Sequence, residues 1–411
     1  MKGFFNLVSS GRFMDLLQGF HQTDFESLPL TDALGRIAAR DIVAHEILPP
    51  FPRSTMDGFA VRARDTFGCS ESEPALLTLI GEIAMGVSGS TLELSAGQTA
   101  AIWTGGELPT GADSVVMMEY TSRIDDRTIE VFRAVAPGEN TIKSGEDYSP
   151  GQPVCPKGTI LRPQELGVMA GLGISSADVF KRPVVAILST GDELVPPEAE
   201  PGPGQIRDIN STTLSALVSD AGGIPLQLGI IPDTLDDMIQ ACQKAVASGA
   251  DIVLFSGGSS VGRRDFTIQA LQSIDGAELL AHGVSIRPGK PTILAKRDNQ
   301  ALFGLPGHVA SAMVVFYLFV RPLIRFMGGL TLDHGLKETR AIAGVAIPSS
   351  PGREEYVRVR LEKTGDVPVA WPIWGRSGLL RPLVQADGMM VVDRDSEGIE
   401  EGETGRVLLF P

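Results

Sequence analysis

Between residues 184 and 326, runs rich in β-branched residues alternate with segments that have the spacing of amphipathic helices. The expected strands are residues 184–188, 225–231, 251–255, 283–287, 291–295 and 301–304. The expected helices lie near residues 212–221, 235–248, 266–273 and 309–326. Strands that are buried on both faces and separated by helices form mostly parallel sheets with right-handed crossovers. This pattern therefore predicts a mostly parallel α/β domain over residues 181–328.

The regions on either side of this stretch have different hydrophobic patterns. A chain of 411 residues is also too long for a single ordinary core, so several domains are expected. Residues 46–142 hold short apolar alternations broken by Gly and Pro, which predicts an inserted antiparallel all-β domain. Residues 1–45 and 143–180 contain helical segments, one of them starting at Thr31, and are expected to form a discontinuous N-terminal or linker domain. Residues 329–411 predict a small β barrel. The expected fold class is multidomain α/β plus β.

Charge and cysteine usage restrict the function classes. The formal net charge of −15 argues against non-specific binding to nucleic acid or to anionic membranes, because basic surfaces supply that affinity. Cys69, Cys155 and Cys242 form no CxxC pair, which disfavours disulfides and structural zinc and predicts a reducing, cytoplasmic compartment. The longest apolar run, Val309 to Val320, has 12 residues; it is too short to span a bilayer and predicts a buried helix.

Glycine-rich loops follow three of the expected strands, at the edge where open α/β sheets bind ligands. They are Ser189-Thr-Gly-Asp-Glu, Ser256-Gly-Gly-Ser-Ser-Val-Gly and Leu305-Pro-Gly-His. Their unhindered N–H groups are suited to cradle phosphate, although any one such turn needs glycine for purely structural reasons. The candidate phosphate-binding residues are Ser256, Gly257, Gly258, Ser259, Ser260, Gly262, Pro306, Gly307 and His308, with the cations Arg287 and Lys290 nearby. A lone histidine such as His308 is more often a loop or cap residue than a catalyst.

Carboxylates gather at the same expected edge. Asp192, Glu193, Asp233 and Asp265 all follow strands, and acids repel a phosphate unless a divalent cation lies between them. We therefore expect a metal-assisted phosphate site there, with Mg²⁺ between the carboxylates and the phosphate. The alternative is structural: Asp233 as the N-cap of the helix from Leu235, and Asp192 as the cap of its own turn. The sequence has no P-loop, dinucleotide-binding GxGxxG or HExxH motif.

Taken together, these motifs resemble the MoeA family of molybdopterin molybdenumtransferases, which includes the C-terminal domain of gephyrin. The resemblance covers nearly the whole chain. It rests on Pro49-Pro-Phe-Pro-Arg-Ser-Thr-Met-Asp-Gly-Phe-Ala, Trp103-Thr-Gly-Gly, Gly145-Glu-Asp, Ser189-Thr-Gly-Asp-Glu-Leu, Gly204-Gln-Ile-Arg-Asp-Ile-Asn, Ser256-Gly-Gly-Ser-Ser-Val-Gly, Arg287-Pro-Gly-Lys-Pro and Gly304-Leu-Pro-Gly.

The resemblance implies a homodimer of four-domain subunits, in which the α/β domain binds molybdopterin and the site lies in a cleft shared with the partner. It implies Mg²⁺-dependent insertion of molybdate into adenylylated molybdopterin with release of AMP, and transient contacts with the adenylyltransferase and with molybdoenzymes. The residues that match family positions important for activity are Asp57, Thr104, Glu193, Asp233, Asp265 and Pro306. On the basis of this resemblance, Glu193, Asp233 and Asp265 are the expected Mg²⁺ ligands. Without the resemblance, Asp57 is better explained as a turn residue before Gly58, and Thr104 as a strand-end hydroxyl.

The sequence departs from the family pattern in two places that face anions in the family. His308-Val309 stands where Asn-Pro is usual, and Ile142 stands where the family has Arg. These departures leave open a paralogue that inserts tungstate or is weakly active, as alternatives to molybdate insertion. A non-catalytic carrier or scaffold for molybdopterin, and a sugar- or nucleotide-phosphate transferase, are the remaining alternatives.

Overall fold

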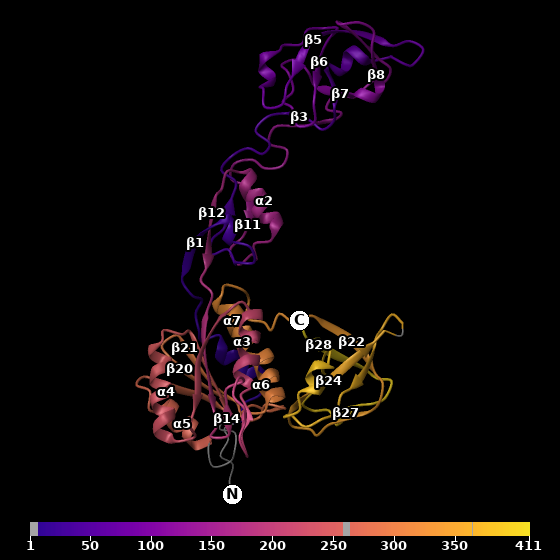
Figure 1. The fold of residues 1–411 in the computed structure, drawn as a ribbon. Helices are drawn as coiled ribbons and strands as arrows, with labels where there is room; N and C mark the ends of the chain where they lie inside the picture. The colour runs from indigo at the N-terminus through magenta and orange to yellow at the C-terminus, as the bar shows by residue number, and fades with distance from the viewer. Residues whose placement is uncertain (1–6, 258–263, 364) are drawn as a thin grey trace. The chain divides into compact units, whose positions relative to one another are not determined.

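The computed structural model describes residues 7–257, 264–363 and 365–411, and at residues 264 and 265 it describes the backbone alone. The chain divides into two compact units (Figure 1). One consists of Met1–Glu26 with Phe180–Pro411, and we refer to it as the α/β–barrel unit. The other is Ser27–Val179, which we refer to as the β-insert unit. Each is described separately below.

A six-stranded sheet forms the centre of the α/β–barrel unit. Its strands are, in spatial order, β16 (Ile224–Ile231), β13 (Val184–Thr190), β17 (Ile252–Gly257), β21 (Gln300–Leu305), β20 (Ile293–Arg297) and β18 (Glu278–His282). The first four strands are parallel, and the last two are antiparallel to their neighbours. The predicted mostly parallel α/β sheet is confirmed, with its ligand-binding edge at the carboxyl ends of β13, β16 and β17.

Helices cover both faces of this sheet, as Figure 1 shows. Alternate residues of β13 and β17 point to opposite faces, so each strand contributes to two cores. One core joins Ile187 and Leu254 to α1 (Ser10–Leu17), α3 (Asn210–Asp220) and the helix that starts at Val309. The other joins Leu188 and Phe255 to α4 (Leu235–Ala247) and α5 (Arg264–Gln272). Burial on both faces explains why these strands read as continuous apolar runs.

The helix that starts at Val309 is longer than the apolar run that predicts it. It runs without interruption through α6 (Val309–Val315), the π-helical turn η5 (Phe316–Val320) and α7 (Arg321–Met327). Its 19 residues have a mean hydropathy of 1.7, so by length and composition the helix is able to cross a membrane. The prediction that this segment is too short to span a bilayer, made from the 12-residue apolar run, was therefore wrong. However, 83% of it is buried inside the protein, which is typical of a core helix. Arg321 extends the helix past the apolar run because its guanidinium pairs with Asp220 at 2.5 Å.

One expected strand lies elsewhere. Only Ile286–Arg287 of the segment 283–287 is extended, as β19, and it pairs with a strand of the C-terminal barrel rather than with the α/β sheet. This strand ends at Arg287 because Pro288 lacks a backbone donor and cannot continue a ladder. The sixth strand of the sheet, β18, was missed because its residues Glu278 and His282 give it the mixed polarity of an edge strand.

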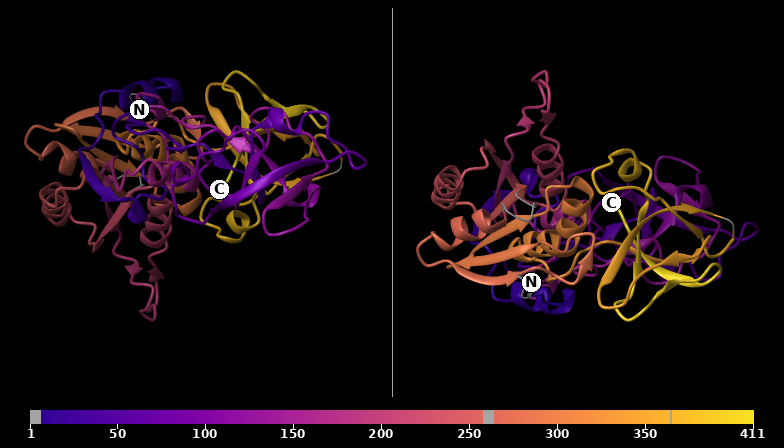
Figure 2. Two further views of the ribbon diagram at one scale, coloured as in Figure 1. Left: turned by 90° about the horizontal axis from the view of Figure 1, so that it is seen from above. Right: turned by 90° about the horizontal axis from the view of Figure 1, so that it is seen from below.

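The predicted C-terminal barrel is confirmed. Five strands close on themselves in the order β24 (Glu354–Glu362), β25 (Val369–Pro372), β22 (Glu338–Ala343), β28 (Thr404–Leu409) and β26 (Gly388–Val392), and β26 pairs back with β24. Small residues and branched side chains fill the interior, among them Ala341, Val359 and Val407. Helix α8 (Arg381–Val384) and the pair β23 (Ile347–Pro348) and β27 (Gly398–Ile399) complete this part, seen from two further directions in Figure 2.

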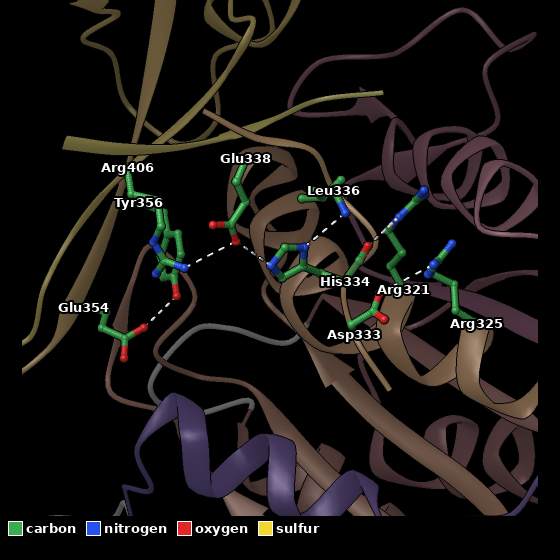
Figure 3. Close-up of polar contacts among 9 residues, drawn as sticks. All are labelled: Arg321, Arg325, Asp333, His334, Leu336, Glu338, Glu354, Tyr356 and Arg406. Carbon is green, nitrogen blue, oxygen red and sulfur yellow. Dashed lines mark hydrogen bonds and ion pairs between the residues drawn. The ribbon is translucent and has the colours of Figure 1, made fainter. Parts of the chain in front are cut away.

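Polar contacts fasten the connection between α7 and the barrel, as Figure 3 shows. The Arg321 Nε donates to the carbonyl oxygen of His334 at 3.0 Å, and the Leu336 N–H donates to His334 Nδ1 at 3.1 Å. Glu338 Oε1 then lies 3.3 Å from His334 Nε2 and 3.4 Å from Arg406 Nη1. The barrel strands β22 and β28 are thereby tied to the segment that follows the core helix.

A second six-stranded sheet forms the centre of the β-insert unit. Its spatial order is β7 (Ser114–Met117), β4 (Gly58–Val61), β6 (Gln98–Ile102), β5 (Ala75–Ile83), β9 (Thr128–Val131) and β8 (Thr121–Arg123). All neighbours are antiparallel except β5 and β6, which are parallel, so the expected purely antiparallel domain is corrected at this one pair. The reason is that residues 84–97 form a crossover between β5 and β6, with one turn of 3-10 helix at Gly89–Thr91, rather than a hairpin.

The remainder of this unit packs around helix α2 (Pro163–Gly171), at the place where the sequence predicts a helix. Short strands complete it: β1 (Phe25–Pro29) with β12 (Ser176–Phe180), β2 (Ile42–Val43) with β11 (Pro153–Cys155), and β3 (Arg53–Ser54) with β10 (Thr141–Ile142). The helix expected from Thr31 was wrong, because only the 3-10 turn Leu30–Asp32 forms. Gly35 then adopts a φ of +73°, which ends any helix at that position.

Candidate active site

A cavity of about 510 Å³ opens at the carboxyl ends of β13 and β17 in the α/β–barrel unit. The segments that form its walls come from six places in the chain. They contribute Thr190, Glu193, Leu194, Ile206, Arg207, Asp208, Ile209, Asn210, Asp233, Ser256, Gly257, Gly307, His308, Val309 and, from the barrel, Gly378. The cavity therefore lies where the strand topology predicts a ligand site. It brings together six of the residues expected from the sequence, namely Glu193, Asp233, Ser256, Gly257, Gly307 and His308.

Two carboxylates face this cavity, and the local backbone explains their placement. A side chain at Gly191 would stand 2.9 Å from Glu193 Oε2, so glycine is needed to let that carboxylate fold back over the turn. The Asp233 N–H donates to Asp192 Oδ1 at 3.0 Å, which joins the loops after β13 and β16. Asp233 is not the N-cap of α4: the cap is Thr234, whose Oγ1 accepts from the Asp237 N–H. The structural alternative for Asp233 is thereby removed, and Asp192 caps a neighbouring loop rather than its own turn.

Asn210, at the start of α3, connects three segments of the cavity wall. Its Nδ2 donates to Ser256 Oγ and to the carbonyl oxygen of Gly307, each at 2.7 Å. Because an amide nitrogen can only donate, the Ser256 hydroxyl acts as an acceptor toward Asn210 and keeps its own O–H for another partner. Asn210 is not among the residues predicted from the sequence, although it lies within the Gly204–Asn210 motif. The available signal was Asp208, which accepts from the Ser211 N–H as a helix-start residue does.

Thr190 presents a polar atom without a partner. Its Oγ1 is buried at the end of β13, and no group in residues 7–257, 264–363 or 365–411 hydrogen-bonds to it. Gly257 approaches so closely that a side chain there would stand 2.4 Å from this oxygen. Since burying an unpaired hydroxyl costs about 1–3 kcal/mol, its presence beside the cavity is more typical of a ligand site than of a packed core.

His308 stands at the N-cap position of α6, but its side chain makes no cap hydrogen bond. Its Nδ1 lies 3.1 Å from Ser377 Oγ, and the Ala310 N–H donates to the carbonyl oxygen of Ser377 at 3.1 Å. The loop that carries Ser377 and Gly378 belongs to the barrel. His308 is thus a loop residue at the start of the helix, as expected, and its imidazole contacts the barrel loop instead of the α6 backbone.

The two expected cations are not in this cavity. Arg287 lines a second cavity of about 270 Å³ between the α/β layer and the barrel, and Lys290 lines a third of about 310 Å³. The second cavity also contains Arg358, Arg376 and Ser377. Arg287 pairs with Glu355 at 3.2 Å, whereas Arg358 donates from Nη2 to Gly375 and its buried Nη1 has no partner among the described residues. Burial lowers the pKa of the Arg358 guanidinium, as it does when a cation is held without a counter-charge.

Asp57 and Thr104 lie in the β-insert unit and contact each other. The Thr104 N–H and Oγ1 both donate to Asp57 Oδ1 at 2.8 Å. The backbone bond and then the side-chain bond lower the pKa of the Asp57 carboxyl, so it is ionised at neutral pH. The two residues form a fixed pair.

Several predicted residues are located only in part. Gly258, Ser259, Ser260 and Gly262 fall outside the described residues. Asp265 lies in α5, and its side chain is outside the description. Pro306 is buried between β21 and α6. Among the described residues, no three His, Cys, Asp or Glu side chains converge as a metal cluster would require.

Comparisons with known proteins cover nearly the whole chain. Residues 12–173 match the family model "MoeA N-terminal region (domain I and II)", residues 186–325 the model "Probable molybdopterin binding domain", and residues 340–410 the model "MoeA C-terminal region (domain IV)". A protein of Bacillus subtilis named molybdopterin molybdenumtransferase is 34% identical over 95% of this chain and 90% of its own length. One from Nostoc with the same name is 34% identical over 95% and 90%.

Solved structures agree with these matches. A crystal structure of the MoeA molybdopterin biosynthesis protein of Pyrococcus horikoshii has a TM-score of 0.83 at 33% identity, covering 98% of this chain and all of that one. Another crystal structure, of a molybdopterin biosynthesis MoeA protein from Pyrococcus horikoshii, has a TM-score of 0.85 at 34% identity, covering 99% of this chain and all of that one. The fold, the order of the motifs and the extent of these matches lead to one conclusion: this chain belongs to the MoeA family.

Proposed function

We propose that this chain is a molybdopterin molybdenumtransferase, which inserts molybdate-derived molybdenum into adenylylated molybdopterin and releases AMP. The observation that carries the proposal is the 510 Å³ cavity, in which Glu193 and Asp233 face Ser256 and the start of the core helix. Such a site combines anion-binding groups with carboxylates, as cleavage of a phosphoanhydride requires. The names of the Bacillus subtilis and Nostoc relatives support the substrate class.

The carboxylates of the cavity fit Mg²⁺. This ion usually takes one or two protein carboxylates and completes its octahedron with water and substrate phosphate, so a full protein cage is not expected. Two such carboxylates line the cavity: Glu193, which folds back over Gly191, and Asp233. Asp265 is the third candidate. When bound, Mg²⁺ neutralises phosphate charge and acidifies bound water.

Other residues of the cavity have roles that follow from their hydrogen bonds. Ser256 accepts from Asn210, so its O–H is left to donate to a phosphate oxygen. Asn210 also fixes the carbonyl of Gly307 and thus the chain before α6. Glu193 and Asp233, as acceptors, orient the water that attacks the phosphoanhydride. These residues thereby bind the phosphate, fix the cavity wall and orient the attacking water.

The arginine-lined second cavity is our candidate for the entering oxyanion. Its volume of about 270 Å³ suits a small tetrahedral anion, and the unpaired Nη1 of Arg358 is a buried donor that such an anion would satisfy. Ser377 borders this cavity and also contacts His308 of the first cavity. Replacement of Arg358 by Met is expected to raise the molybdate concentration needed for half-maximal activity and to leave AMP affinity unchanged.

The remaining family expectations are part of this proposal. The enzyme works as a homodimer in which Asp57 and Thr104 of one subunit complete the cavity of the other. It contacts the adenylyltransferase and client molybdoenzymes transiently and acts in the cytoplasm, in keeping with its three free cysteines.

The test is AMP release and cofactor formation by the purified chain, supplied with adenylylated molybdopterin and Mg²⁺ and with molybdate, tungstate or neither. Release stimulated by molybdate supports the proposal, and stronger stimulation by tungstate would assign the His308-Val309 departure to tungstate. Tight binding without release would point to a carrier. Full AMP release by Asp265→Asn would remove Asp265 from the site, and unchanged turnover by a well-folded Asp57→Ala dimer would remove Asp57.

A further inference from the structure

Three large apolar side chains are exposed at one edge of the sheet in the β-insert unit. Met56 precedes β4, Trp103 follows β6 and Met118 follows β7. Strand β4 lies between the other two, and Gly58 is opposite both Ile102 and Met117, so the three residues stand at the same edge. Their exposed fractions are 38%, 37% and 45%. Three neighbouring exposed residues of this size are more typical of a binding surface than of a solvated strand end.

A fixed carboxylate lies among them. Asp57 Oδ1 accepts both donors of Thr104, whereas no donor in the described part of the chain reaches its Oδ2. The backbone is equally constrained: the Met118 N–H donates to the Asp57 carbonyl oxygen at 3.0 Å. A side chain at Gly58 would stand 2.0 Å from the Val116 carbonyl oxygen, so only glycine allows this approach. Asp57 therefore presents one unpaired oxygen in a set position.

Trp103 precedes the residue that bonds to this carboxylate, and it has an anchored indole ring. Its Nε1 donates to Glu82 Oε1 at 2.7 Å, which uses the ring's single polar atom and limits its rotation. Since the next residue, Thr104, is bonded through its N–H to Asp57, the Trp103 backbone lies directly next to the acid. The edge thus combines an anchored aromatic ring, two adaptable thioether side chains and an acceptor-only carboxylate.

We propose that this edge binds the pteridine ring of the substrate, stacked on Trp103, with its 2-amino and N3–H groups donating to Asp57 Oδ2. The inference rests on the proposed function and adds the recognition of the heterocycle, whereas the phosphate is assigned to the cavity in the α/β–barrel unit. A carboxylate matches two adjacent N–H donors, and an indole stacks on any flat heterocycle. Adenine presents an acceptor nitrogen beside its amino group, so the carboxylate selects the pterin over the adenine.

The test measures binding of three soluble probes to the full-length protein by calorimetry: pterin, lumazine and adenosine. Lumazine has the same bicycle with a carbonyl in place of the 2-amino group. We expect pterin to bind about tenfold or more tightly than lumazine, and adenosine to bind more weakly than pterin, because only pterin offers the paired donors. Equal binding of pterin and lumazine, or no binding of pterin, would overturn the proposal.

Variants separate the two contacts. Trp103→Ala should weaken pterin about tenfold or more, and Trp103→Phe should weaken it less because a flat ring remains. Asp57→Asn should bring pterin affinity down to that of lumazine. The matched control is Trp371→Phe: Trp371 is 36% exposed and bonds to Glu362 through Nε1, like Trp103 to Glu82, but lies in the barrel. This variant should bind pterin as the unaltered protein does.

The outcomes distinguish this inference from the proposed function. If the unaltered protein releases AMP with molybdate and Trp103→Phe, Trp103→Ala and Asp57→Asn all bind pterin normally, the ring site is wrong and the transferase proposal stands. If pterin binding depends on Trp103 and Asp57 but no AMP is released, the ring site stands and the proposed chemistry is wrong.

Discussion

At the residue scale, the pair Asp57 and Thr104 shows how a short contact sets the protonation of an exposed acid. Thr104 lowers the Asp57 pKa below its ordinary value of 3.8, chiefly through its N–H and then through its hydroxyl. Thr104→Val keeps the N–H and removes the hydroxyl, so the Asp57 pKa should rise part of the way toward that value. A carbon-detected NMR titration of the carboxyl measures this, and Thr104→Ser is the control that should leave it unchanged.

The sign of the stability effect follows. Because the folded pKa is depressed, the ionised Asp57 stabilises the fold above the unfolded pKa, and this contribution is lost as the pH falls through the folded pKa. Thr104→Val should therefore be less stable than Thr104→Ser at neutral pH, and the difference should shrink in acid. A difference that grew as the pH fell would contradict this assignment.

Gly191 leaves the space that the Glu193 carboxylate occupies. A methyl group at Gly191 would stand 2.9–3.0 Å from the Glu193 carboxylate and displace it. We expect Gly191→Ala to raise the Mg²⁺ concentration for half-maximal AMP release about tenfold, as loss of a supporting contact does at other metal sites. Gly167→Ala is the control, since the space around Gly167 in α2 is open, and it should leave the Mg²⁺ dependence unchanged.

At the scale of elements, Asn210 connects the start of α3 to the end of β17 and to the loop before α6. Asn210→Ala removes two hydrogen bonds and should lower the free energy of unfolding by about 1–3 kcal/mol. Asn210→Asp has the same shape but cannot donate, so it should lose at least as much. Urea denaturation measures both variants. A stability equal to that of the unaltered protein in both would show that the three segments hold their places without this contact.

The core helix depends on another long-range contact between elements. Arg321 is 7% exposed in α7, and its guanidinium bonds to Asp220 of α3 and to the His334 carbonyl. Removing a buried charge's partner typically costs 3–5 kcal/mol, but Asp220 is 45% exposed, and asparagine at this position keeps a side-chain oxygen that accepts from the guanidinium. We therefore expect Asp220→Asn to destabilise by about 1 kcal/mol and Arg321→Ala by about 3 kcal/mol in chemical denaturation. If Asp220→Asn destabilised the protein more than Arg321→Ala, most of the stabilisation would come from Asp220 instead.

At the scale of the whole molecule, the two units have separate cores, and each contains one buried cysteine. Cys242 is buried in the core of the α/β–barrel unit, where burial raises its pKa to about 12, and Cys155 is buried beside α2 in the β-insert unit. Only a thiolate reacts readily with iodoacetamide. In a Cys69→Ser background, each thiol should stay unlabelled until its own unit unfolds. Labelling at increasing urea concentration, read by mass spectrometry, should give two transitions, and one shared transition would show that the units unfold together.

Much of the fold could be predicted because its signals are local. The β-branched runs of β13, β16 and β17 and the helical spacing of α3 and α4 follow from periodicities within a few residues, and parallel topology then places their carboxyl ends together. The placement of Glu193 and Asp233 at the cavity followed from that rule. The helix expected at Thr31 failed because a local apolar spacing without tertiary support does not make a helix.

Pairings between distant segments became visible only in the folded protein. The alternation of strands and helices, the C-terminal barrel and the edge on which a ligand site forms could all be predicted from the sequence, since each depends on near neighbours in the chain. It did not determine that Asn210 joins Ser256 to Gly307, that the barrel contributes Ser377 and Gly378, or that Arg287 and Lys290 line other cavities. Those contacts arise from packing between elements far apart in sequence, and no local periodicity encodes which side chains then meet.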